Sequence, residues 1–313
     1  MRSPALPTET RLIRNFEQLR ARAQLLGPKR VAVICAEDEI ALTAASDGLL
    51  LGICLPVLIG NDHNIRSLAA ELHLTALLDK ASIVPAEEPV KVAVQMARAG
   101  EVDILLKGHM RSDQLLTAVL DRDCGLRTGR VLADIALFPM ACADGSQRLV
   151  SMGDGGVNVA PDLQQKKAII ESSIETMQCL GVARPKVAIL SATEAVTDRM
   201  PSTLDARILT EMAAAGAFGD AEVFGPLALD NALFEWAARA KGISHPVAGH
   251  ADCLVVPNIE AGNLLGKSIL FLQKSPYAHI VLGAKTPILI PSRVERAEDK
   301  VNAMALGVLF AAR

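Results

Sequence analysis

The feature that most constrains this chain is the regular alternation of short apolar runs with longer stretches of helical periodicity. Apolar runs of strand length occupy residues 31–36, 56–60, 82–85 and 102–106. Residues 37–51 and 90–99, which lie between them, have the periodicity of helices instead. Because parallel strands need a long crossover, usually a helix, this order predicts an α/β fold with a mostly parallel sheet covered on both faces.

The alternation continues through the second half of the chain. Strands are expected at residues 132–139, 148–152, 187–191, 253–257, 279–283 and 287–290. Helices are expected at residues 161–180, 204–214, 231–240 and 296–310. A chain of 313 residues is long for a single hydrophobic core, so we expect two domains. No linker separates the two blocks, which indicates that the domains exchange strands.

The composition argues against several classes of function. Aromatic residues make up 3% of the chain and the formal charge is -3, so we expect neither stacking platforms nor a basic face for nucleic acid. No apolar run is long enough to cross a membrane, and the N-terminal segment lacks the apolar stretch of a signal peptide. The six cysteines form no C-x-x-C pair, as zinc sites often do. We therefore expect a cytoplasmic protein that binds neither nucleic acid nor membrane and holds no metal.

Residues 261–268 match a relaxed phosphate-loop pattern, which ends in Lys267 and Ser268. Such a loop would make the chain a nucleotide-dependent phosphotransferase. However, Ala261 stands in place of the first glycine, and two leucines fill the loop interior. The apolar spacing also continues past the pattern, as in an amphipathic helix that begins near Ile259. We expect that helix and keep the phosphotransferase as the alternative function.

Two further clusters are weaker candidates. His245, His250 and Asp252 have the residue types of a metal site but no third strong ligand at a usual spacing, so a loop explains them better. The glycine-rich turn at residues 153–156 does not match a dinucleotide-binding fingerprint. It is equally well explained as a tight turn that lines a cleft and as a turn with a structural role only.

Several cationic side chains follow predicted strands or lie in loops. Lys107 and His109 come at the end of the strand 102–106, and the carboxyl ends of parallel strands line ligand-binding crevices. Arg127 and Arg130 offer guanidinium groups, which suit phosphate. Exposed turns would account for these residues as well.

The segment from residue 287 to Asp299 combines a strand end with Ser292, Arg293 and a following helix. Ser292 and Glu295 have the spacing of a capping box, in which the two side chains satisfy free backbone N–H groups. The same segment also offers a hydroxyl for an oxyanion, an arginine for phosphate and a carboxylate for a proton. The pattern alone leaves both interpretations open.

At these residues the chain resembles the phosphate acetyl/butyryltransferase family. The resemblance extends over most of the chain, and its shared stretches are residues 107–110, 115–120, 125–129, 200–205, 225–231 and 256–263, followed by Ser292, Arg293 and Asp299. It implies an enzyme that exchanges coenzyme A and inorganic phosphate on a short acyl group, acetyl or butyryl, so that acyl-CoA and phosphate give acyl phosphate and CoA. It implies no cofactor, since CoA is a substrate, no metal, and a homodimer.

The resemblance also implies a fold like that of the isocitrate and isopropylmalate dehydrogenases, with two α/β domains and a cleft between them. In this arrangement residues 1–134 plus 281–313 form the first domain and residues 135–280 form the second.

The resemblance further assigns roles to individual residues. Asp299 is the base that deprotonates the CoA thiol, whose ordinary pKa is about 8.5. Ser292 stabilises the transition state through a hydrogen bond, and Arg293 binds phosphate. The residues expected to bind substrate or CoA are Lys107, His109, Arg127, Asn263 and Lys274.

The acetyl and butyryl branches differ at several positions in this family. Residues 289–294, Thr117 and residues 225–231 look closer to the butyryl branch. The preferred acyl chain stays open at this stage.

Overall fold

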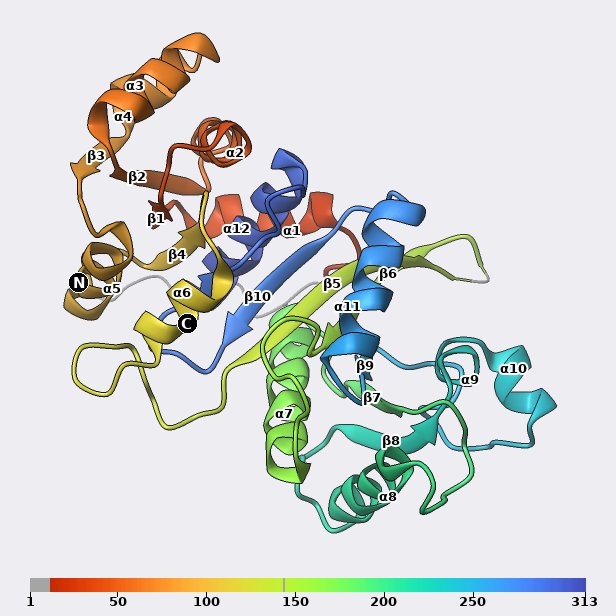
Figure 1. Cartoon of the computed structure of the whole chain (residues 1–313). Helices are drawn as coiled ribbons and strands as arrows, with labels where there is room; N and C mark the ends of the chain where they lie inside the picture. The colour runs from red at the N-terminus through yellow and green to blue at the C-terminus, as the bar shows by residue number, and fades with distance from the viewer. Residues whose placement is uncertain (1–11, 143) are drawn as a thin grey trace, which may run out of the picture.

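The computed structural model describes residues 12–142 and 144–313. Its strands are β1 (Lys29–Ile34), β2 (Cys54–Gly60), β3 (Ser82–Pro85), β4 (Ile104–Lys107), β5 (Ala133–Ala141), β6 (Gln147–Gly153), β7 (Lys186–Leu190), β8 (Glu222–Leu227), β9 (Cys253–Val255), β10 (Ala278–Leu282) and β11 (Ile288–Leu289). In the described part of the chain they form one 11-stranded sheet in the order β3-β2-β1-β4-β11-β10-β5-β6-β9-β7-β8. The sheet runs through the whole molecule (Figure 1).

The strands on either side of the sheet centre are parallel to their neighbours. The pairings β3-β2, β2-β1, β1-β4 and β4-β11 are parallel, and so are β6-β9, β9-β7 and β7-β8. At the centre, β10 runs antiparallel to both β11 and β5, and β5 runs antiparallel to β6. The mostly parallel α/β fold predicted from the sequence is therefore confirmed, with an antiparallel centre that joins two parallel halves.

The helices pack on both faces of this sheet (Figure 1). They are α1 (Phe16–Leu26), α2 (Glu39–Leu50), α3 (Asp62–Glu71), α4 (Thr75–Lys80), α5 (Pro89–Ala99), α6 (Ser112–Val119), α7 (Leu163–Cys179), α8 (Pro201–Ala214), α9 (Leu229–Leu233), α10 (Glu235–Ala240), α11 (Ile259–Lys267), the π-helical turn η1 (Ser268–Leu272) and α12 (Ala297–Ala311). Side-chain caps start several of them: Asp38 accepts a hydrogen bond from the N–H of Ala41, and Asn258 accepts one from that of Ala261.

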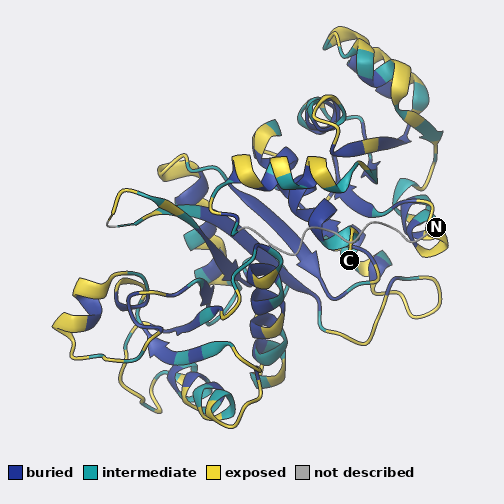
Figure 2. Ribbon diagram, turned by 180° about the vertical axis from the view of Figure 1, so that it is seen from behind, coloured by how far each residue is buried: buried dark blue, intermediate teal, exposed yellow. Residues whose placement is uncertain are grey.

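Burial follows the period of each element. Along β1, Val31 and Val33 belong to the core on one face of the sheet, whereas Ala32 and Ile34 belong to the core on the other. The helix α12 is exceptional because residues 299–309 are all buried. It packs between the sheet and the helices α1 and α2. Figure 2 shows buried strands along the sheet and exposed outer faces on the surrounding helices.

The predicted division into two domains stays a prediction. Its boundaries fall inside strands, because residues 134 and 135 both belong to β5 and residues 280 and 281 both belong to β10. Residues 1–11 of the first predicted domain lie outside the described residues. In the described part of the chain, no helix is long and apolar enough to cross a membrane.

Candidate active site

A cavity of about 380 Å³ opens between the two parallel halves of the sheet. Its wall comes from elements far apart in the sequence: the turn after β4, the turn after β6, the helix α11, the strands β5 and β10, and the segment that follows β11. The side chains that carry charge or a hydroxyl in this wall are Lys107, Arg111, Ser112, Asp113, Asp134, Lys267, Tyr277, His279, Ser292, Arg293 and Glu295. Cations, carboxylates and hydroxyl groups therefore face one open cavity.

Some of the residues proposed from the sequence meet in this cavity. Lys107, Asn263, Ser292 and Arg293 all contribute to its wall. They come from β4, α11 and the turn after β11, so the fold unites positions that are up to 186 residues apart in the chain, from Lys107 to Arg293. The turn at residues 153–156 also reaches the wall through two of its glycines, which agrees with the cleft-lining alternative for this turn.

Other proposed residues lie outside the cavity wall. His109 is on the turn after β4 with 64% of its side chain exposed, and its Nδ1 atom is 3.6 Å from a carboxylate oxygen of Asp38. Arg127 is exposed and pairs through its backbone with Ala284. Lys274 is exposed on the segment that precedes β10. Roles for these three residues in binding CoA stay predictions.

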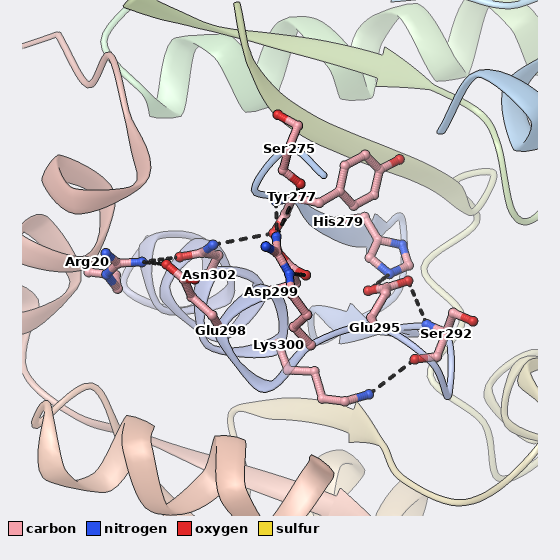
Figure 3. A network of polar contacts seen from close by, with 11 residues as sticks. Arg20, Ser275, Tyr277, His279, Ser292, Glu295, Glu298, Asp299, Lys300 and Asn302 are labelled. Carbon is pink, nitrogen blue, oxygen red and sulfur yellow. Dashed lines mark hydrogen bonds and ion pairs between the residues drawn. The ribbon is translucent and has the colours of Figure 1, made fainter. Parts of the chain in front are cut away.

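The peptide groups of Ser292 are held on both sides by charged side chains. Its N–H donates to Oε1 of Glu295 at 2.7 Å, and its carbonyl oxygen accepts a hydrogen bond from Nζ of Lys300 at 3.3 Å (Figure 3). The bond to Glu295 is the one that the capping-box spacing predicts. However, the helix α12 begins only at Ala297, so this bond closes a turn that precedes the helix. The Ser292 hydroxyl therefore does not cap the N-terminus of α12.

Asp299 is not part of the cavity wall. It is buried, and its carboxylate is held by Arg296, whose Nε and Nη2 atoms each lie 2.8 Å from one of its oxygens. The N–H of Tyr277 donates a third hydrogen bond at 3.0 Å (Figure 3). Asp299 thus ties the start of α12 to the residue that precedes β10, and it would have to part from Arg296 to act as a base. Its role as the thiol base stays a prediction.

A buried network of ionisable side chains was missed by the sequence analysis. Nδ1 of His279, on β10, lies 3.0 Å from Oδ1 of Asp134, on β5. On its other side, Nε2 of His279 lies 3.6 Å from Oε2 of Glu295. Burial disfavours a charged imidazole, but the two carboxylates outweigh this effect and raise the pKa of His279 to about 10. His279 is therefore a buried cation between two carboxylates.

The alternating pattern of a strand could have drawn attention to His279. It is a polar residue within the otherwise apolar run of β10, where a buried side chain needs a partner. The partner, Asp134, lies 145 positions away, so the sequence gives no sign of the pair.

Lys107 supplies a buried positive charge at the carboxyl end of β4. Its Nζ atom donates to the carbonyl oxygen of Met110 at 3.3 Å. Burial, together with the nearby cations Lys300 and Arg293, lowers the pKa of Lys107 to about 8, although Glu295 acts in the opposite direction. Positive charges crowded around a cavity make it suited to an anion.

The turn at residues 153–156 supports α11 at the cavity edge. The backbone N–H groups of Gly156 and Val157 donate to a carboxylate oxygen of Asp154, each at 2.8 Å. Burial and the neighbouring Asp134 nevertheless raise the pKa of Asp154 to about 6. Gly262 of α11 packs so tightly on this turn that a Cβ atom there would lie 2.8 Å from the carbonyl oxygen of Asp154.

The phosphate-loop interpretation of residues 261–268 is wrong in its local geometry. These residues belong to α11, apart from Ser268 at its C-terminus, and not to a loop. The N–H of Gly262 donates to the carbonyl oxygen of Asn258 within the helix, so the backbone does not form a cradle of free N–H groups. The amphipathic helix expected from near Ile259 is confirmed.

The histidine and aspartate residues near β9 do not converge on one point. His245 stacks on Phe224 with ring centroids 4.0 Å apart. Asp252 pairs instead with Arg148 at 3.1 Å. Within residues 12–142 and 144–313, no three His, Cys, Asp or Glu side chains are placed to hold a metal ion.

Residues 78–308 of the chain match the family described as phosphate acetyl/butaryl transferase. The phosphate acetyltransferase of Rhizobium meliloti is 36% identical over 313 residues, which cover 100% of this chain and 96% of that protein. The phosphate butyryltransferase of Clostridium beijerinckii is 34% identical over 303 residues, which cover 96% of this chain and 99% of that protein.

Solved structures have the same fold. A branched-chain phosphotransacylase from Enterococcus faecalis aligns with a TM-score of 0.77 and 27% identity, covering 90% of this chain and 99% of that one. A phosphotransacetylase from Streptococcus pyogenes aligns with a TM-score of 0.79 over 95% of this chain and 99% of that one, with 19% identity, so this likeness concerns the fold alone.

Proposed function

The chain belongs to the phosphate acetyl/butyryltransferase family, and from this membership we propose that it exchanges coenzyme A and inorganic phosphate on a short-chain acyl group. The observation that carries the proposal is the meeting of Ser292, Arg293 and Lys107 in one cavity wall. A hydroxyl donor beside two cations suits an acyl phosphate, which has a carbonyl oxygen to be hydrogen-bonded and a phosphate to be held.

The proposed reaction is a direct transfer without an acylated enzyme. In one direction the thiolate sulfur of CoA attacks the carbonyl carbon of the acyl phosphate. The bond between this carbon and the bridging oxygen breaks, and phosphate leaves with the electron pair. In the other direction a phosphate oxygen attacks acyl-CoA and the CoA thiolate leaves. We propose that this transfer needs no cofactor and no metal.

Ser292 and Arg293 have separate parts in this scheme. Ser292 donates a hydrogen bond to the oxygen that becomes negative as the tetrahedral transition state forms. Arg293 pairs with the phosphate through its guanidinium group, whose fork of N–H donors matches phosphate oxygens. Both side chains come from one turn, so the carbonyl and the phosphate of a single substrate can be bound together.

The family resemblance gives the thiol proton to Asp299. This assignment supposes that the carboxylate separates from Arg296 when substrates bind, since both of its oxygens are engaged in the described structure. Loss of turnover in Asp299→Asn, with an Arg296→Lys variant for comparison, would support it. Full activity of Asp299→Asn would contradict it.

We also propose that the protein is closer to the butyryl branch in its preference, forms a homodimer in solution and is cytoplasmic. We further propose that its fold is like that of the isocitrate and isopropylmalate dehydrogenases. The acetyl and butyryl relatives are similarly close to this chain, at 36% and 34% identity, so chain length has to be measured.

The deciding experiment is an assay of thiol release from acetyl-, propionyl-, butyryl- and 3-hydroxybutyryl-CoA, with and without phosphate. The proposal predicts CoA release that depends on phosphate, and net hydrolysis of acyl-CoA when arsenate replaces phosphate, because acyl arsenates hydrolyse in water. Release that is independent of phosphate and arsenate with every acyl-CoA would rule out the reaction.

A further inference from the structure

A line of charged side chains leads from the far wall of the cavity to Ser292. It begins at Asp134 on β5, passes through His279 on β10 and reaches Glu295, which accepts the N–H of Ser292. The exposed fractions of Asp134, His279 and Glu295 are 6%, 8% and 5%, so all three side chains are buried. Figure 3 shows the His279 ring beside Glu295 and the Glu295 carboxylate beside Ser292.

The contact between His279 and Glu295 is an ion pair that is too long for a hydrogen bond. Nε2 of His279 and Oε2 of Glu295 are both buried without a hydrogen-bond partner, and they face each other at 3.6 Å. Packing alone does not require such a trio, because well-packed apolar residues often stabilise a core as well as a buried ion pair does. Apolar residues, however, offer no acceptor for the N–H of Ser292.

Nothing else in the described structure holds the N–H of Ser292. Its carbonyl oxygen is held separately, by Nζ of Lys300 and by the backbone N–H of Glu295 at 3.1 Å. The Glu295 carboxylate therefore holds the N–H side of the Ser292 peptide, and His279 is the cation that faces the other oxygen of this carboxylate. A donor that stabilises a developing oxyanion has to be placed within a few tenths of an ångström, on the order of 0.5 Å.

We propose that His279 is a positioning residue for the acyl transfer: backed by Asp134, it holds the Glu295 carboxylate on the Ser292 N–H and so aims the Ser292 hydroxyl at the acyl oxygen. This inference rests on the proposed function. It assigns a part in turnover to three residues that need not touch the substrate.

The charged groups around His279 determine how the network responds to pH. The two carboxylates face the ring from β5 and from the turn before α12, and Tyr277, just before β10, has its ring centroid 6.0 Å away. Asp154 lies behind Asp134, and the cations Lys300 and Lys107 lie beside Glu295. With both carboxylates present, the imidazole stays charged up to about pH 10.

The first test compares His279→Gln and Glu295→Gln in two backgrounds, the wild type and Ser292→Ala. In the wild type, each substitution is expected to lower kcat by about 10- to 100-fold, a share of the roughly 10²- to 10³-fold effect of one oxyanion donor. The KM values for CoA and phosphate should change little. In the Ser292→Ala background the same substitutions should lower kcat no further, because the hydroxyl that they position is absent.

The second test uses Asp134→Asn, which leaves His279 with one carboxylate. The pKa of His279 should then fall toward its ordinary value of about 6.5. Once the imidazole is neutral, it no longer holds Glu295, so kcat of the variant should decline as pH rises above neutrality, whereas kcat of the wild type should not. Loss of a merely structural contact would lower kcat by the same factor at every pH.

Asp103→Asn is the matched control, because it removes a carboxylate that pairs with Arg30 through 2.7 and 3.0 Å contacts near the other end of β4. It should retain the kcat of the wild type. If His279→Gln fails to fold, the pH profile of Asp134→Asn decides instead. This inference would be wrong if the kcat losses of His279→Gln and Glu295→Gln multiplied with that of Ser292→Ala, or if Asp134→Asn lost the same factor of kcat at every pH. The proposed function would stand in either case. Absence of phosphate-dependent CoA release in the wild type would overturn the proposed function and this inference with it.

Discussion

The hydroxyl of Ser292 can be removed without disturbing the three bonds that hold its backbone, since all of them use its peptide groups. Ser292→Ala should therefore fold normally and lose roughly 10²- to 10³-fold in kcat, the usual effect of removing one oxyanion donor. Steady-state kinetics and a thermal melt check the two parts. Ser268→Ala, which removes an exposed hydroxyl bonded to the carbonyl of Leu264, is the control and should change neither. Undiminished kcat in Ser292→Ala would leave Ser292 with a structural role only.

We predict that Lys107 makes the reaction depend on alkaline pH. A lysine carries its charge below its pKa, so with a pKa of about 8 Lys107 loses its charge as pH rises through that value. If it binds phosphate, kcat/KM for phosphate should decline above about pH 8. Lys107→Met should lower kcat/KM by about 10- to 100-fold near neutral pH, equivalent to one charged hydrogen bond of about 1.5–3 kcal/mol.

The comparison of pH profiles separates Lys107 from the substrates, which also titrate. Lys107→Met retains the titration of phosphate and of the CoA thiol, so only the component that belongs to the lysine should vanish. Lys285→Met, at an exposed lysine that donates to the carbonyl of Arg98, should keep the wild-type profile. Identical profiles for wild type and Lys107→Met would contradict the assignment.

Single residues could be predicted from the sequence where a motif or a strand end marked them. Ser292, Arg293 and Lys107 were found this way, and all three reach the cavity. His279 was not found, because its partner lies in a distant strand and pairing of that kind depends on sheet order. Asp299 was proposed from the family resemblance, but its bonds to Arg296 could not be predicted, because they depend on where the turn before α12 begins.

At the scale of elements, the contact between α11 and the turn after β6 leaves no room for a side chain. A Cβ atom at Gly262 would lie 2.8 Å from both the carbonyl oxygen of Asp154 and the Cα atom of Gly155, so the backbone has to shift. Gly262→Ala should lower the free energy of unfolding by about 1–3 kcal/mol despite the better helix propensity of alanine. It should also lower activity, since Gly155 and Asn263 both line the cavity.

Urea denaturation and the phosphate-dependent assay measure the two effects. Leu264→Ala, on the same helix but with 68% of its residue surface exposed, is the control and should retain stability and turnover. A Gly262→Ala variant as stable and as active as the wild type would show that α11 can move away from the turn freely.

Elements with strong periodicity were predicted closely, whereas irregular ones were missed. The strand β3 (Ser82–Pro85) has its predicted bounds, and α7 and α12 differ from prediction by a few residues. The strand β8 (Glu222–Leu227) was not predicted, because glycine and proline interrupt it and both are unfavourable in strands. The helix expected at residues 231–240 is instead two short helices, α9 and α10, separated at Phe234, which has an extended backbone.

On the scale of the whole molecule, the buried His279 should make stability depend on pH. Its pKa in the folded state, about 10, is above the value of about 6.5 for an exposed histidine. A raised pKa contributes stability that is complete below about pH 6.5 and is lost as pH rises toward 10. The melting temperature of the wild type should therefore fall over this range more steeply than that of His279→Gln.

Thermal melts at pH 6, 8 and 10 measure the difference between the two proteins. The gap in melting temperature should be widest at pH 6 and should narrow by pH 10, because the wild-type histidine is then losing its proton. A gap of constant size would mean that the pKa of His279 is the same in the folded and unfolded states, and that the two carboxylates do not raise it.

The sheet as a whole could be predicted only in part. Alternating strands and helices indicate parallel pairing, which holds in both outer parts of the sheet. The antiparallel centre, where β10 lies between β11 and β5, leaves no mark in the sequence, because a buried strand has the same apolar pattern in either direction. The cavity lies beside this centre, so its full set of residues could not be assembled from the sequence alone.

The burial of α12 has a consequence for how the chain is made. Its residues 299–309 fill the core beside α1, and Arg20 meets Asn302 across 282 positions of sequence. During synthesis, the apolar faces of α1, α2 and β1 therefore stay uncovered until α12, near the end of the sequence, has been made. A product that stops before α12 would expose that apolar surface to chaperones and proteases, so a truncated product is expected to be degraded.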